Sequence, residues 1–213
     1  EQIEWAVAEG ADYIVAETFS DVGEAKLALK AIKEHGNDLP SVVTFAQNIA
    51  GRTRDGFSFA DACKALEEDG ADVVGLNCSS GPEIMLDMMR EVRAKCKGPL
   101  AAVPVPYRTT KTEPQMQTLS LPSGERAFPR NLDYFYSTQD DMFEFGKACQ
   151  ELGILYVGIC CGNTARHFRR LAESFGREPA ACRYSTDMSK HYAYGNHPSL
   201  KDTNTKDLKA LQG

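Results

Sequence analysis

The feature that most constrains the fold is a short unit that recurs along the chain. The sequence reads Glu-Gly-Ala-Asp at residues 9–12 and Asp-Gly-Ala-Asp at residues 69–72, and residues 151–154, Glu-Leu-Gly-Ile, are a looser copy. Each copy follows a helical pattern and precedes an apolar run. A glycine at this point is typical of a helix C-terminus, where the backbone turns left-handed. The unit therefore predicts repeated helix–loop–strand connections on a parallel sheet.

Five apolar runs are predicted strands, and most read as continuous rather than alternating, as expected when both faces are buried. They cover residues 13–17, 42–46, 73–77, 100–105 and 155–160. Helices are predicted at residues 2–9, 22–35, 59–68, 83–95, 139–152 and 164–175. Five such strands fit an open doubly wound sheet, or the last five units of a barrel of eight strands. The opening helix favours the barrel, because it would lead from an upstream strand into the first strand here.

Three of the seven cysteines lie directly at the ends of predicted strands. Cys78 follows the strand at residues 73–77, and the strand at 155–160 ends in Cys160 and Cys161. Active sites form at this C-terminal edge in barrels and open α/β sheets, so we expect the three thiols to meet. Three thiolates suit zinc (Zn2+) and leave a fourth position open for a substrate. Buried inert thiols and a redox pair remain alternatives, although adjacent cysteines form a strained disulfide.

Adjacent residues of a strand point to opposite faces, so one ion can reach both Cys160 and Cys161 only if the chain bends there. Gly158 and Gly162 flank the pair and supply the freedom for such a bend.

Composition excludes several classes of protein. The net charge is −6, whereas electrostatic nucleic-acid binders carry a basic face. No apolar run reaches the length of a membrane span, and no signal peptide is visible. The cysteines are spread thinly, unlike those of small disulfide-rich secreted domains. We therefore expect a cytoplasmic protein that binds neither nucleic acid nor membranes.

The cysteine motifs resemble those of the homocysteine S-methyltransferase family, and most closely its betaine–homocysteine methyltransferase branch. The sequence has Gly-Leu-Asn-Cys at residues 75–78, Gly-Ile-Cys-Cys-Gly at residues 158–162 and Ala-Glu-Thr-Phe at residues 16–19. The resemblance implies a (β/α)8 TIM barrel. Residues 1–182 would supply its last five βα units, and residues 183–213 a polar C-terminal arm. The family's N-terminal Asp-Gly motif, which helps to hold homocysteine, has no counterpart in this sequence.

The resemblance also implies roles for individual residues. The implied zinc ligands are Cys78, Cys160 and Cys161. The implied substrate-binding residues are Glu17, Thr18, Phe19 and Asn77. Among these, Glu17 takes the place of the family's homocysteine-contacting glutamate. Thr18 stands where betaine-using members carry an aromatic residue, so the resemblance identifies the methyl acceptor more firmly than the donor.

Together these residues predict a zinc-dependent enzyme that moves a methyl group from a betaine-like onium donor to the thiol of homocysteine, giving methionine. Zinc deprotonates a coordinated thiol, and placement of the two substrates supplies the remaining rate acceleration. No residue beyond the metal site is therefore predicted to be catalytic. Two alternatives stay open: the same chemistry with a sulfonium donor such as S-methylmethionine or another thiol acceptor, and an inactive zinc-binding fragment. The resemblance also implies a homo-oligomer in which the arm wraps a neighbouring subunit.

Overall fold

The computed structural model describes residues 1–47, 51–185, 187–192, 195–203, 206 and 210. The chain forms two compact units, residues 1–177 and residues 178–213. The boundary predicted after residue 182 stays a prediction. Parts of the predicted arm lie outside the described residues, namely 186, 193–194, 204–205, 207–209 and 211–213.

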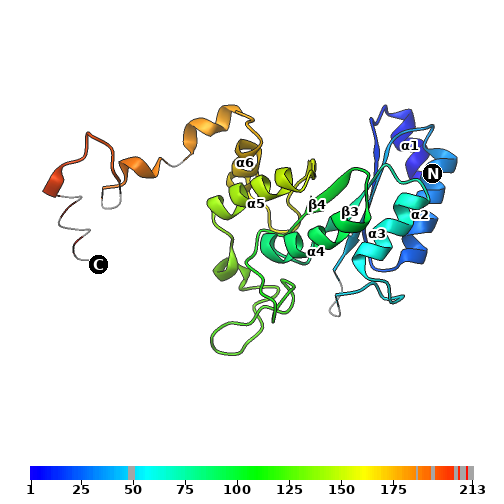
Figure 1. Ribbon diagram of the computed structural model, residues 1–213, viewed down its shortest axis with the longest axis horizontal. Coiled ribbons are helices and arrows are strands. Elements are labelled where there is room, and N and C mark those ends of the chain that lie inside the picture. The colour runs from blue at the N-terminus through cyan, green and yellow to red at the C-terminus, as the bar shows by residue number, and fades with distance from the viewer. Residues whose placement is uncertain (48–50, 186, 193–194, 204–205, 207–209, 211–213) are drawn as a thin grey trace. The chain divides into compact units, whose positions relative to one another are not determined.

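The first unit alternates helices with parallel strands (Figure 1). The strands are β1 (Ile14–Phe19), β2 (Ser41–Ala46), β3 (Val73–Asn77), β4 (Leu100–Val103) and β5 (Tyr156–Val157). The helices are α1 (Gln2–Ala8), α2 (Val22–His35), α3 (Phe59–Glu68), α4 (Pro82–Lys95), α5 (Gln139–Glu151) and α6 (Ala165–Ser174), with a 3-10 helix η1 (Leu132–Phe135) before α5. Every predicted helix and strand is present, and the largest difference is the short β5.

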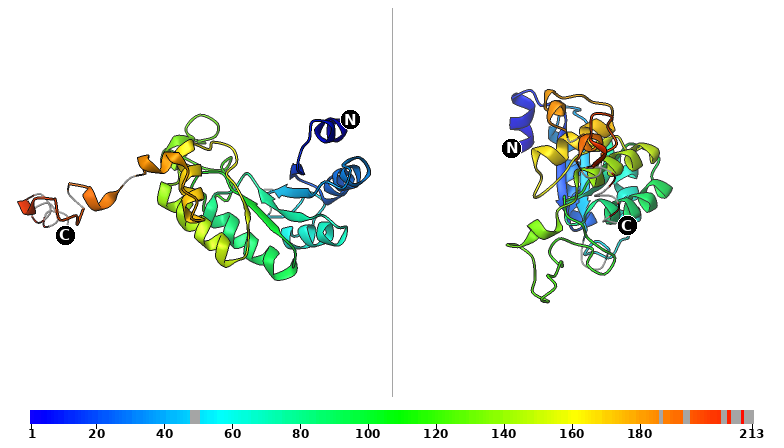
Figure 2. Two further views of the ribbon diagram at one scale, coloured as in Figure 1. Left: turned by 90° about the horizontal axis from the view of Figure 1, so that it is seen from above. Right: turned by 90° about the vertical axis from the view of Figure 1, so that its left-hand side faces the viewer.

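The strands are hydrogen-bonded in chain order, β1-β2-β3-β4-β5, and every neighbouring pair is parallel. A doubly wound sheet reverses its strand order at a switch point, and this sheet does not. Right-handed crossovers that always advance in one direction place their helices on one face. Helices α2 to α5 form such a layer, each in contact with the next, on one side of the sheet (Figure 2). The sheet is therefore a segment of a (β/α)8 barrel, and the doubly wound alternative is excluded.

The main core lies between the helix layer and the sheet. On α2 the apolar side chains recur every three or four residues, so that Ala25, Leu29 and Ile32 form one buried stripe. Phe45 of β2 and Leu76 of β3 are likewise almost fully buried in this core. Burying a side chain of this size contributes about 1.5–3 kcal/mol, which fixes the register of each helix on the sheet.

A second apolar cluster holds the long segment between β4 and α5. Its buried members are Cys78, Val105, Tyr107, Met116, Leu119, Ala127 and Leu132. The segment leaves the sheet because Pro104 and Pro106 have no N–H to donate to a strand ladder. The neighbouring β5 pairs over only two residues, Ala101 with Tyr156 and Ala102 with Val157, and beyond it the Cys160 N–H donates to the Pro104 carbonyl at 2.7 Å. Because Cys78 belongs to this cluster, the long segment forms a wall of the cysteine site.

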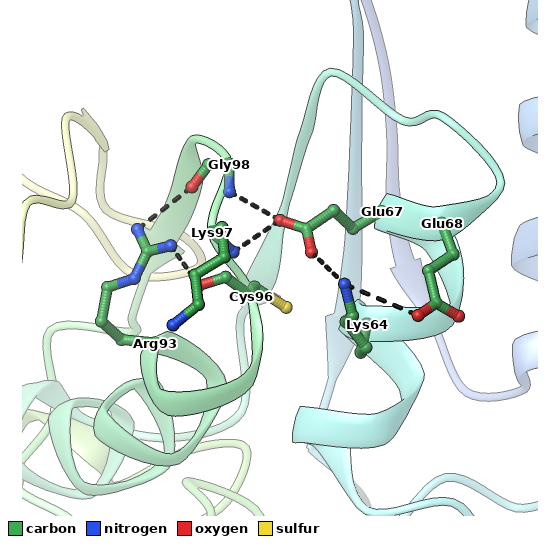
Figure 3. A network of polar contacts seen from close by, with 7 residues as sticks. All are labelled: Lys64, Glu67, Glu68, Arg93, Cys96, Lys97 and Gly98. Atoms are coloured by element: carbon green, nitrogen blue, oxygen red, sulfur yellow. Dashed lines mark hydrogen bonds and ion pairs between the residues drawn. The ribbon is translucent and has the colours of Figure 1, made fainter.

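The opposite, N-terminal end of the sheet is tied together by Glu67, near the end of α3 (Figure 3). Its carboxylate accepts hydrogen bonds from the backbone N–H groups of Lys97, at 2.7 Å, and Gly98, at 2.6 Å, which lead into β4. Lys64 donates to the other carboxylate oxygen at 2.9 Å. Arg93 completes the network by donating to the carbonyl of Gly98 at 3.1 Å. These contacts join α3, α4 and β4 at the end of the sheet opposite to Cys78, Cys160 and Cys161.

In the second unit, the described residues include two short 3-10 helices, η2 (Ala180–Tyr184) and η3 (Met188–Lys190). Three large side chains of this unit, Tyr184, Met188 and Tyr192, are exposed. None of the helices in the described part of the chain has the length and apolarity needed to span a lipid bilayer.

Candidate metal centre

Three thiols meet at the C-terminal edge of the sheet. The Sγ atom of Cys161 lies 3.7 Å from that of Cys78 and 3.9 Å from that of Cys160, and all three sulfur atoms lie within 4.8 Å of one another. Zinc–sulfur bonds of about 2.3 Å at tetrahedral angles separate two sulfurs by about 3.8 Å. The spacing and the soft donor atoms therefore fit a zinc ion. None of the seven cysteines forms a disulfide in this structure.

Cys78 is aimed by a left-handed turn at the end of β3. Both Cys78 and Ser79 have positive φ, 60° and 59°. Side chains other than glycine adopt this conformation at a cost of about 1–2 kcal/mol per residue, and such strain gathers at functional sites. Hydrogen bonds hold the turn in place: the Cys78 N–H donates to the Val103 carbonyl at 2.8 Å, and the Ser80 N–H donates to the Cys78 carbonyl at 2.7 Å.

The Cys160–Cys161 pair is turned toward Cys78 by a bend at Gly162, where φ is +87°. A Cβ atom on this glycine would lie 2.1 Å from the hydroxyl oxygen of Tyr107, so the site accepts no side chain without movement. The Tyr136 hydroxyl donates to the Gly162 carbonyl at 3.1 Å. The predicted bend is thus confirmed at Gly162, whereas Gly158 lacks a positive φ.

Asn77 joins β3 to the ends of β1 and β2. Its side-chain oxygen accepts hydrogen bonds from the Thr18 N–H and from the Thr44 hydroxyl, both at 2.9 Å, and its Nδ2 donates to the Thr18 hydroxyl at 2.7 Å. Thr18 has φ of +72°, unusual for a β-branched residue, and the register of β1 shifts there. Asn77 is fully buried beside Cys78, so its observed role is to hold the strand ends. Substrate contacts from Asn77 and Thr18 stay predictions.

Glu17 and Phe19 lie on different sides of β1. Glu17 is exposed and lines a cavity of about 280 Å³ along the sheet, together with Tyr13 and Tyr156. The pKa of the Cys160 thiol is lowered chiefly by the Cys78 thiol, and the negative charge of Glu17 opposes that lowering, so the carboxylate acts on the cysteine cluster. Phe19 is half-buried and packs against the main core. The geometry is therefore more favourable to a substrate contact from Glu17 than from Phe19.

The three thiols ionise unequally. A hydrogen bond from the Cys78 thiol lowers the pKa of Cys160 to about 6, against the opposing effect of burial. The same hydrogen bond and burial raise the pKa of Cys78. Burial also raises the pKa of Cys161. Among the three thiols of the cluster, Cys160 is therefore the one whose pKa is lowered.

Comparison with known proteins identifies the family. The sequence profile of homocysteine S-methyltransferases matches residues 1–175 of the 213 residues. This chain belongs to the homocysteine S-methyltransferase family.

Individual members of the family are similar over much of the chain. Betaine–homocysteine S-methyltransferase 1 of Xenopus laevis is 31% identical over 182 residues, which are 83% of this chain and 43% of that protein. S-methylmethionine–homocysteine S-methyltransferase of Pongo abelii is 29% identical over 211 residues, 97% of this chain and 54% of that protein. The chain therefore spans about half the length of these relatives.

A solved structure supports the fold. The apo form of the homocysteine methyltransferase MmuM from Escherichia coli superposes with a TM-score of 0.58 at 16% identity. The match covers 81% of this chain and 53% of that chain. At this identity the likeness concerns the barrel architecture alone.

In this family member an aromatic stack packs against the loop that carries Cys160 and Cys161. The sequence did not predict this stack. The Tyr107 and Tyr136 rings stack with centroids 5.1 Å apart, and the His167 ring lies 5.5 Å beyond Tyr136. His167 is almost fully buried; its ring nitrogens contact the Thr164 hydroxyl at 3.0 Å and the Ser137 carbonyl at 2.8 Å. These residues come from three separate segments, so no local spacing in the sequence signals the stack.

Proposed function

We propose that this chain carries the zinc-binding part of an enzyme that transfers a methyl group from an onium donor to the thiol of homocysteine, giving methionine. The observation that carries the proposal is the spacing of the Cys78, Cys160 and Cys161 sulfurs, which matches a tetrahedral thiolate site. Family membership supports homocysteine as the acceptor. A metallated form of the Escherichia coli enzyme MmuM has also been solved, which supports a metal in the family.

Zinc held by the three thiolates would supply the charge that keeps a substrate thiol deprotonated at neutral pH. The chain's own residues then act by positioning. Asn77 fixes the strand end that bears Cys78, and Gly162 fixes the turn that bears Cys161. An onium donor leaves as a group that is neutral at the reacting centre, so the methyl transfer itself needs no general acid or base. Correct placement of the thiol relative to the methyl group is the main source of the rate acceleration.

Glu17 is proposed to bind the α-ammonium group of homocysteine. It is exposed on the cavity side of β1, and its charge acts on Cys160. A carboxylate near the thiolate site would attract a cation there through a charge-assisted hydrogen bond. Thr18, Phe19 and Asn77 would complete the substrate-binding set around the same strand end.

The donor has two candidates. Betaine is supported by the relative named for it in Xenopus laevis. A sulfonium donor is favoured by Thr18, which offers no aromatic face to a quaternary ammonium group, and by the Pongo abelii relative named for S-methylmethionine. Another thiol acceptor would use the same chemistry. Because the chain spans about half of its relatives, an inactive zinc-binding fragment is the remaining candidate.

A cytoplasmic location and a homo-oligomer are part of the same proposal. Seven cysteines, none of them in a disulfide, suit a reducing compartment. Exposed Tyr184, Met188 and Tyr192 give residues 183–213 apolar side chains with which to contact a second subunit. The net charge of −6 argues against nucleic acid as a partner.

The decisive experiment is the zinc content of protein purified under reducing conditions. We expect about one zinc per chain in the parent and in a Cys149→Ala control, and none in Cys160→Ser, because Cys149 is a buried thiol outside the cluster. Absence of zinc from a folded parent supplied with zinc, or its retention by Cys160→Ser, would contradict the proposal. Turnover of homocysteine with betaine or S-methylmethionine then distinguishes the donors, and zinc binding without turnover supports the inactive fragment.

A further inference from the structure

A cavity of about 490 Å³ lies between α4 and α5, outside the cysteine site. This volume falls within the range of sites that bind small molecules, about 300–1,000 Å³. Its walls come from the first turns of α4, from one face of α5, and from residues 108–110 and 137, which frame the long segment after β4. None of the predicted zinc or substrate residues lines it.

The inner part of this cavity is apolar. Leu86 of α4 and Phe145 of α5 line it and are buried, and Pro82 lines it at the start of α4. On α5, Asp141, Glu144 and Phe145 stand at positions i, i+3 and i+4, which share one face of a helix. That face therefore presents both apolar and acidic side chains to the cavity. A ligand would therefore need an apolar segment to displace water from this surface.

The rim of the cavity is acidic. Glu83, Asp141 and Glu144 line it, and Arg108 is the one basic residue among its lining side chains in the described structure. The Asp141 carboxylate accepts a hydrogen bond from the Thr138 N–H, as part of the cap of α5. The carboxylates of Glu83 and Glu144 make no ion pair with the described part of the chain. The excess of negative charge favours a cationic ligand.

A buried hydroxyl in the wall lacks a partner. Ser137 lines the cavity and is only 3% exposed, and its Oγ has no hydrogen-bond partner among the described residues. The backbone of Ser137 is already engaged, since its N–H donates to the Pro106 carbonyl at 2.9 Å and its carbonyl contacts the His167 ring at 2.8 Å. A buried hydroxyl without a partner is uncommon in proteins, and a donor on a ligand would satisfy it.

We propose that this cavity binds a small organic ammonium compound with an apolar carbon chain. The carbon chain would lie on Leu86 and Phe145, and the ammonium groups would pair with Glu83 and Glu144 at the rim. An ammonium N–H would also supply the hydrogen bond that the Ser137 hydroxyl lacks. Nothing in this site depends on zinc or on methyl transfer.

The test is isothermal titration of the purified protein with putrescine, a four-carbon diamine, at low ionic strength. We expect saturable binding that weakens about tenfold in the double variant Glu83→Gln, Glu144→Gln, because each exposed charge pair contributes modestly. The matched control Glu151→Gln removes an exposed carboxylate from the same helix outside the cavity, and should bind as the parent does. Ser137→Ala should weaken binding several-fold.

Two further measurements keep the result unambiguous. The thermal unfolding midpoints of the variants should equal that of the parent, so that lost binding reports the site rather than misfolding. Cys160→Ser protein should bind putrescine as the parent does, which separates this proposal from the zinc proposal. No saturable binding by the parent, or equal affinities in the double variant and in the Glu151→Gln control, would overturn the inference.

Discussion

Asn77 and Thr18 hold each other by two reciprocal hydrogen bonds, although 59 positions separate them in the sequence. The pair lies at the point where β1 bulges and where β3 delivers Cys78. Thr44 of β2 donates a third bond to the same amide, so one buried side chain fixes the ends of three strands. The position of Cys78 therefore depends on a residue that carries no reactive group.

The first prediction follows from this arrangement. Asn77→Ala should lower the free energy of unfolding by about 3 kcal/mol, because it leaves the buried Thr44 hydroxyl and the part-buried Thr18 N–H without an acceptor and opens space at the fully buried position 77. It should also weaken zinc binding. Thr44→Val, which removes one of these bonds, should cost about 1 kcal/mol. Urea denaturation and zinc titration measure both effects, and equal losses in the two variants would contradict the argument.

The second prediction concerns the turn at Gly162. Gly162→Ala should abolish or strongly weaken zinc binding, because the added Cβ would lie 2.1 Å from the Tyr107 hydroxyl. The matched control is Gly124→Ala, which has a similar φ of +83° but nothing within 4 Å of the new atom. The control should cost only about 1 kcal/mol of stability and keep its zinc. Normal zinc content in Gly162→Ala would show that the turn tolerates displacement.

The third prediction is a pH dependence of stability. Burial lowers the pKa of His167 below its usual 6.5, so the unfolded chain takes up the proton more readily than the folded one. The full contribution of His167 to stability is present above pH 6.5 and is lost as the pH falls below that value. His167→Asn should therefore lose less stability than the parent between pH 7.5 and pH 5.5. Parallel unfolding free energies across this range would contradict the assignment.

The fourth prediction separates the two ends of the sheet. Glu67→Ala should cost about 2 kcal/mol, because the N–H groups of Lys97 and Gly98 lose a charged acceptor (Figure 3). Zinc content should not change, since Cys78, Cys160 and Cys161 lie at the other end of the strands. Glu68→Ala is the control: Glu68 makes only an exposed ion pair with Lys64 at 3.6 Å, worth less than about 1 kcal/mol. Thermal unfolding with zinc analysis tests both statements.

Most of the fold could be predicted because its signals are local. A helix followed by glycine and an apolar run is visible within 20 residues, and β1 to β4 begin within a residue of their predicted positions. The barrel was predicted from the opening helix and the family resemblance rather than from the strands themselves, because the choice between a barrel segment and a doubly wound sheet depends on which strands become neighbours. The short β5 also escaped prediction, because its length depends on where β4 beside it ends, at Val103, rather than on its own apolar residues.

In the candidate site, too, some features could be predicted from the sequence and others could not. Cys78, Cys160 and Cys161 could be brought together from sequence because parallel strands deliver their C-terminal ends to one edge. The Tyr136–His167 contact could not, because it joins a loop to a helix through ring packing and leaves no periodic trace. The hydrogen bonds of Asn77 likewise could not be predicted from the sequence, because they depend on the backbone geometry of the bulge at Thr18.

The thiols follow β3 and β5, which lie on either side of β4 and do not pair with each other. Sulfurs less than 4 Å apart across this intervening strand require the sheet to curve. The absorption spectrum of a cobalt ion bound to these thiols would therefore report on the curvature of the sheet. This absorption should fade when the strands flatten or part, even while the helices keep their circular dichroism, so the site would record the loss of tertiary order before the loss of secondary structure.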